Sequence, residues 1–340
     1  MGRRGCELLL GDFIALADRD PAMLPRLLAL VDGICRTLHT TTAATGATTP
    51  LSRCRPGLYA DRIRRGGRLD TWYLRQDLPL SLPGTRARLT AGQLRHYTLT
   101  VNGRPLTVNL PALINDARRT LTPRSRWTTA ITQGDPTEPN IADPLCWLDF
   151  EHAGRNTLPG ESAALLWYLM AHGGWLVPRH QPGTHRRTLR LALAPHPAPL
   201  IEHLALDENE RHITLRYTWN TGTGRHAALT RALLHLAPAP GFLDGTRAFL
   251  TLRILGVIPP TLLRTADLLL VHLDRGVPRE PGEGKCRPAC CWGHGAGPPI
   301  RSGSCACEPL CWPPPWPQPP PPWHPPPPPA PTTLTARAAP

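Results

Sequence analysis

The stretch that decides the fold is Ile131–Asn156, which has the sequence ITQGDPTEPNIADPLCWLDFEHAGRN. It holds Asp135, then Asn140, then Asp149. A turn at residues 142–144 lies between the last two and is flanked by apolar residues, a pattern that predicts a small β-hairpin. Because a hairpin brings its two ends together, we expect Asn140 and Asp149 to face one point in space, with Asp135 just before them.

This set of side chains has the chemistry of a metal site. Two oxygen ligands beside a carboxylate suit a Mg²⁺–phosphate site, because Mg²⁺ prefers hard oxygen donors and fills its remaining positions with water and substrate phosphates. The simpler alternative is a surface turn, rich in Asp and Pro, that only caps a hairpin. Both interpretations stay open at this point.

Residues 134–150, GDPTEPNIADPLCWLDF, resemble the aminoglycoside phosphotransferase (choline kinase-like) family of kinase-like enzymes. In that family the motif is H-G-D-x-x-x-x-N and a later Asp holds metal. The resemblance implies that Asp135 is the catalytic carboxylate, which accepts the proton of the substrate hydroxyl. It implies that Asn140 and Asp149 are the Mg²⁺ ligands, as in the general kinase scheme. The sequence departs from the family at Gln133, where His is usual, and in the short spacing from Asn140 to Asp149.

The resemblance implies an α+β fold: a mainly helical, kinase-like C-terminal lobe with small β-hairpins. A kinase-like enzyme also needs an N-terminal lobe, whose glycine-rich loop covers the phosphates and whose lysine pairs with them. Too few residues precede the strand expected at 7–13 to form that lobe, and Lys285 is the only lysine of the chain. The chain therefore resembles the substrate-binding lobe alone. Either Met1 is an internal start of a longer gene, or nucleotide binding has been lost.

The reaction implied is ATP- and Mg²⁺-dependent transfer of phosphate to a hydroxyl of a small molecule, impaired because the nucleotide-binding lobe is absent. ATP binding by this chain is itself in doubt. The alternative is a non-catalytic pseudokinase remnant or scaffold with the same fold. The substrate is not identified, because no acidic cluster outside the motif marks a pocket for a cationic aminoglycoside.

Local patterns predict the other elements. Asp20-Pro21 favours the start of a helix with an apolar stripe that ends near Leu38. Asn102-Gly103 favours a type I′ hairpin between residues 99–101 and 106–108, and residues 40–56 are expected to form an exposed loop. Strands are also expected at 7–13, 189–193 and 212–219, and helices at 57–75, 111–121, 160–176, 227–236, 243–255 and 265–273.

The formal charge of +13 invites a nucleic-acid interpretation. Nearly all of the positive charge is arginine, however, and Ala, Pro and Gly are abundant, which indicates GC-rich coding DNA. Few aromatic residues interleave with the arginine clusters, so no stacking platform for single strands is indicated. Nucleic acid is therefore not an expected partner, and no protein partner is indicated.

Neither a signal peptide nor a membrane span is predicted. The apolar run after Arg3 and Arg4 is too short, and no later run reaches the ~18–20 apolar residues that a spanning helix needs. The Cys residues at 6, 35, 54 and 146 have no metal or disulfide spacing. We therefore expect a cytoplasmic protein with reduced cysteines and no membrane partner.

The composition changes sharply near residue 276, so we expect a phosphotransferase domain at 1–275 and a disordered Pro/Cys-rich tail at 276–340. Three interpretations of the tail stay open: a zinc site, a Pro-rich ligand for SH3-type partners, and an out-of-frame translation of GC-rich DNA, which we favour. The candidate zinc ligands are Cys286, Cys290, Cys291, His294, Cys305, Cys307 and Cys311.

Overall fold

The computed structural model describes part of the chain, and the predicted tail and the boundary at residue 275 lie outside that part. The described residues are 8–269, except 55–58, 76–77, 83–88, 107, 171, 184–195, 239–241, 264 and 266–268. Within these residues, no helix has both the length and the apolar composition needed to cross a membrane.

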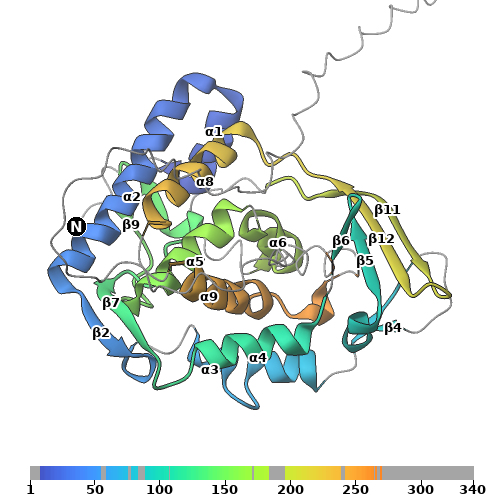
Figure 1. The fold of residues 1–340 in the computed structure, drawn as a ribbon. Coiled ribbons are helices and arrows are strands. Elements are labelled where there is room, and N and C mark those ends of the chain that lie inside the picture. Colours follow the sequence, from blue (N-terminus) through green and yellow to red (C-terminus); the bar gives the residue numbers. More distant parts are fainter. Residues whose placement is uncertain are drawn as a thin grey trace, which may run out of the picture. The chain divides into compact units, whose positions relative to one another are not determined.

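The structure is an α+β fold that is mainly helical and has small sheets (Figure 1). Its helices are α1 (Leu10–Arg19), α2 (Leu24–Thr45), α3 (Ala60–Ile63), α4 (Leu110–Thr120), α5 (Leu158–Leu169), α6 (His172–His180), α8 (Thr223–Leu236) and α9 (Phe242–Gly256). Short helical turns are η1 (Pro21–Met23), η2 (Leu51–Arg53), η3 (Asp70–Leu74), η4 (Ala91–His96), η5 (Glu138–Asn140) and η6 (Pro260–Leu262). The strands are β1 (Leu8–Leu9), β2 (Ala47–Pro50), β3 (Pro79–Leu80), β4 (Leu89–Thr90), β5 (Thr98–Val101), β6 (Arg104–Leu106), β7 (Arg126–Thr132), β8 (Ile141–Asp143), β9 (Cys146–Trp147), β10 (Gly154–Thr157), β11 (Leu200–Asp207) and β12 (His212–Thr218).

The strands form small sheets with the orders β1-β8-β9, β10-β7-β2, β11-β12-β5-β6 and β3-β4. Neighbouring strands are antiparallel, except that β12 pairs with β5 in parallel and places His212 opposite Thr98. The candidate site lies between the first two sheets, because its loop leaves β7 and continues into β8.

Helix α5 is shared by two large buried clusters. One cluster packs α1, α2, α5 and α8 together and includes Phe13 and Leu166. The other packs α4, α5 and α9 against the four-stranded sheet and includes Ala163 and Phe249. A helix that is buried on all sides belongs in a core, and Figure 1 shows α5 between α8 and α9. The site loop is therefore anchored beside the centre of the described fold.

Several predictions from local sequence are confirmed. Asn102 and Gly103 both have positive φ angles, 47° and 81°, and connect β5 to β6, as a type I′ turn requires. The second strand, expected at 106–108, is instead Arg104–Leu106. The side chain of Asp20 accepts a hydrogen bond from the Ala22 amide at the start of η1, which leads into α2. The predicted hairpin after Asn140 is present as β8 and β9. The expected strand at 212–219 and helices at 111–121, 227–236 and 243–255 are β12, α4, α8 and α9.

The prediction of a strand at 7–13 is wrong beyond Leu9. Strand β1 ends there, and α1 begins at Leu10. The buried residues of this segment include Leu10, Phe13, Ile14 and Ala17, which recur with the helical spacing of three and four. Leu8 and Leu9 of the short apolar run thus form β1, and Leu10 begins an amphipathic helix.

The prediction of an exposed loop at 40–56 is also wrong. Helix α2 continues to Thr45, and its threonine hydroxyls bond back to the helix: Thr42 donates to the Leu38 carbonyl at 2.6 Å and Thr45 donates to the Thr41 carbonyl at 2.8 Å. Strand β2 follows and pairs with β7. Threonine favours strands when a partner edge is present.

The other expected elements differ in length or lie outside the described residues. The helix expected at 160–176 is divided into α5, which ends at Leu169, and α6, which begins at His172. The segment 57–75 is helical only in α3 and η3. The strand expected at 189–193 lies outside the described residues, and so does most of the helix expected at 265–273.

Candidate functional site

The loop that carries Asp135 begins with a turn at Gly134. This glycine has a φ of 96°, and a Cβ atom added to it would lie 2.1 Å from the His152 carbonyl oxygen. Only glycine fits both the backbone conformation and the close approach. The turn reverses the chain directly after β7 and sets Asp135 beside the β8–β9 hairpin.

Gln133 joins the two ends of the site. Its side-chain amide donates to the backbone carbonyls of Leu148 (2.8 Å) and Asp149 (2.6 Å), and its side-chain oxygen accepts from the Asp135 amide at 2.7 Å. The side chain is buried. The residue that departs from the family motif therefore still binds both segments, since a carboxamide offers a donor and an acceptor at once.

Asn140 is buried and turns its amide nitrogen toward Asp135. Its Nδ2 lies 3.0 Å from the Asp135 carbonyl oxygen and 3.4 Å from the Oδ2 atom of the carboxylate. Its backbone carbonyl accepts from the Leu148 amide at 2.8 Å, which ties η5 to the end of the hairpin. Because both partners of Nδ2 are acceptors, the Oδ1 atom is the one left for a ligand.

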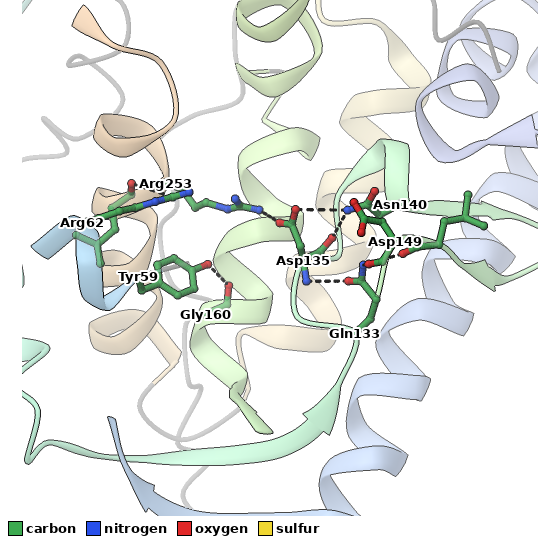
Figure 2. Close-up of polar contacts among 10 residues, drawn as sticks. Tyr59, Arg62, Gln133, Asp135, Asn140, Asp149, Gly160 and Arg253 are labelled. Atoms are coloured by element: carbon green, nitrogen blue, oxygen red, sulfur yellow. Dashed lines mark hydrogen bonds and ion pairs between the residues drawn. The ribbon is translucent and has the colours of Figure 1, made fainter. Parts of the chain in front are cut away.

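Asp149 lies at the other end of the hairpin and is exposed to solvent. Its backbone has a φ of 50°, a conformation that Asp tolerates better than most residues. One carboxylate oxygen, Oδ1, accepts from the Glu151 amide at 3.2 Å. Figure 2 shows Gln133 between Asp135 and Asp149, and Asn140 next to Asp135. The structure thus brings the three predicted site residues onto one connected unit.

The donor set fits a hard divalent cation in part. The Oδ1 atom of Asn140 and the free oxygen of Asp149 are hard ligands of the kind that Mg²⁺ takes, with water and phosphate oxygens in the other positions. Among the described residues, no group of three or more His, Cys, Asp or Glu side chains has the arrangement of a metal site. A metal here would therefore be held by few protein atoms and would depend on the phosphates of a ligand.

The sequence did not reveal the partner of Asp135. Arg253 of α9 donates from its Nη2 atom to the Oδ1 atom of Asp135 in a close ion pair (Figure 2). The Arg253 side chain is 4% exposed and that of Asp135 is 21% exposed. One signal was present: Arg253 interrupts an apolar run between Leu252 and Ile254, and a lone charge on a buried helix face needs a charged partner.

A second residue that the sequence reasoning missed is Glu161 of α5. Its carboxylate accepts from the Thr132 hydroxyl and from the Gly134 amide, and burial raises its pKa to about 7. Its Oε2 atom is buried without a hydrogen-bond partner. The carboxyl group borders a cavity of about 10 Å³, the room of a single water molecule. The other residues around the cavity are Leu51, Cys54, Tyr59, Ala60, Asn156 and Thr157.

A buried ion pair fixes the middle of the loop. Glu138 of η5 pairs with Arg225 of α8, and both side chains are almost fully buried. The Nη1 atom of Arg225 also donates to the Tyr168 carbonyl at 2.6 Å. The segment between Asp135 and Asn140 is therefore held to both α5 and α8.

Comparison with known proteins identifies no relative. No protein-family model matches the chain, and neither a curated protein nor a solved structure is similar to it. The kinase-like architecture therefore stays a prediction.

Proposed function

We propose that the chain is a kinase-like phosphotransferase lobe of the aminoglycoside phosphotransferase type, which transfers phosphate from ATP to a hydroxyl of a small molecule with Mg²⁺. The observation that carries the proposal is the single connected unit of Asp135, Asn140 and Asp149, joined through Gln133. Base, amide ligand and carboxylate ligand are the parts that this reaction requires.

In this proposal Asp135 accepts a hydrogen bond from the substrate hydroxyl and takes its proton. Asn140 and Asp149 would hold the Mg²⁺ ion, which would supply charge neutralisation for the phosphates of the donor. The remaining work is positioning, because phosphoryl transfer needs its attacking and leaving oxygens in line. The hydrogen bonds of Gln133 to both segments keep the base at a fixed place relative to the metal ligands.

The specific observation that favours the alternative, a non-catalytic remnant or scaffold, is the state of Asp135. Its Oδ1 atom pairs with Arg253, and its Oδ2 atom faces the Asn140 amide. A carboxylate with both oxygens engaged is less available to a substrate. The chain also has no lysine before Lys285 to pair with ATP phosphates.

Nucleotide binding separates the two functions. At a MgATP concentration of 100 times Kd, an enzyme of this class gains about 2.7 kcal/mol of stability, which a thermal-shift titration detects. Asp135→Asn is expected to lower turnover at least about 100-fold and to leave that shift in place. The enzyme proposal is wrong if MgATP neither binds in calorimetry nor shifts the melting temperature, and the scaffold alternative then stands.

A further inference from the structure

Arg253 reaches the site from the core. Its guanidinium lies 5.9 Å from the centre of the Trp167 ring on α5, and its Nε atom is buried without a hydrogen-bond partner. Burial lowers the pKa of Arg253, because desolvation disfavours the charged form. The position of this side chain is therefore set by packing, and its charge needs an anion close by.

The surroundings offer Arg253 more positive charge and little negative charge. Arg62 is buried nearby, and its pKa is lowered to about 9 by burial and then by repulsion from Arg253. The Nη1 atom of Arg62 donates to the Leu252 carbonyl in the last turns of α9, at 3.5 Å. Within the described part of the chain, Arg253 forms its ion pair with the carboxylate of Asp135. The negative charge of Asp135 is thus paired with a cation that extends from the core.

Arg253 and the metal ligands approach Asp135 from different sides. Figure 2 shows the guanidinium of Arg253 on one side of the carboxylate and Asn140, with Asp149 beyond it, on the other. An unpaired Asp135 would add a full negative charge next to Asn140 and Asp149, and it could reach a cation as a third oxygen ligand. The ion pair with Arg253 removes that charge from the site.

We propose that Arg253 is a built-in counter-cation of this site, which occupies Asp135 and so keeps its carboxylate from binding the divalent cation. The inference rests on the proposed metal ligands Asn140 and Asp149. It assigns Arg253 a positioning role. The site then binds a metal ion weakly, because Arg253 neutralises the charge of Asp135. The affinity for a bare divalent cation is then low until phosphates supply the missing negative charge.

The test uses Mn²⁺ as the probe, in the full chain without nucleotide, with the affinity measured by electron paramagnetic resonance of the free ion. Arg253→Met is expected to bind Mn²⁺ about tenfold more tightly than the unchanged protein, because it frees one negative charge and deletes one positive charge. Arg253→Lys, which keeps the charge, is expected to bind as the unchanged protein does. Arg231→Met is the matched control, since Arg231 pairs with Asp32 on α2, outside the site.

Two further variants keep the test valid if Arg253→Met folds poorly. Asp135→Asn alone is expected to weaken Mn²⁺ binding, because it leaves the positive charge of Arg253 without its partner beside the site. Asp135→Asn combined with Arg253→Met is expected to lose the tenfold gain. If the double variant still binds Mn²⁺ about tenfold more tightly than the unchanged protein, the gain does not come from the freed Asp135 carboxylate, and the inference is overturned.

The outcomes separate this inference from the proposed function. If the unchanged protein binds Mn²⁺ and Arg253→Met binds no more tightly, or gains no more than Arg231→Met, the inference is wrong and the metal ligands stand. If only Arg253→Met binds Mn²⁺ without nucleotide, the inference holds, and the proposed function is decided separately by the MgATP titration. If neither protein binds Mn²⁺, both the metal site and the inference are wrong.

Discussion

The buried pair of Glu138 and Arg225 allows a sharp prediction about stability. The change is Glu138→Ala, which leaves the Arg225 guanidinium in the core without its carboxylate. The two side chains are 2% and 4% exposed, so water cannot replace the lost partner. Removing one member of a buried ion pair costs about 3–5 kcal/mol of unfolding free energy, which corresponds to a fall in melting temperature of roughly 6–20 °C for a domain of this size.

The assay is urea denaturation followed by circular dichroism, with two comparison variants. Asp116→Ala removes a carboxylate from an exposed pair with Arg119 and is expected to cost less than about 1 kcal/mol. Glu138→Leu combined with Arg225→Met removes both charges and is expected to recover a large part of the loss. If Glu138→Ala is no more destabilising than Asp116→Ala, the buried pair does not hold the site loop and the reasoning fails.

Two further predictions concern residues next to Asp135. The pKa of Glu161, about 7 in the folded protein and 4.5 in the solvated state, means that the folded state keeps a proton that the unfolded state releases. The free energy of unfolding is therefore expected to fall by about 3 kcal/mol as the pH rises from about 4.5 to 7. In Glu161→Gln the urea midpoint of unfolding should change less with pH over that range. If the urea midpoint of Glu161→Gln depends on pH as strongly as that of the unchanged protein, the assignment is contradicted. Gly134→Ala is expected to destabilise the protein by more than Gly103→Ala. Both glycines have positive φ angles, which cost an alanine strain. Only at position 134 would the added Cβ also meet His152, because position 103 has open space. Equal melting temperatures for these two variants would show that the loop relaxes freely.

Local signals in the sequence predicted the parts of the fold that local physics decides. Asn-Gly fixes a hairpin turn through its backbone preferences alone, and Asp-Pro starts a helix in the same way. The closeness of Asp135, Asn140 and Asp149 was predictable for the same reason, since a tight hairpin brings its own ends together. These features need no knowledge of the rest of the chain.

The remainder depends on partners far away in the sequence. Strand β2 forms because β7 offers an edge, and the two are separated by the whole of α3 and α4. Arg253 lies 118 positions from Asp135, so no motif around Asp135 could announce it. In the sequence, Gln133 was only a departure from a motif. Its three hydrogen bonds join segments whose positions the sequence does not give.

The parallel pairing of β12 with β5 has a consequence for how the chain is made. Hairpin β5–β6 is complete at Leu106, yet its outer edge stays without its neighbour until His212 and the following residues have been synthesised. At about 5–20 residues per second, translation takes on the order of ten seconds to cover that interval. During this time the backbone N–H and C=O groups along that edge of β5 have no strand partner and can pair with another chain.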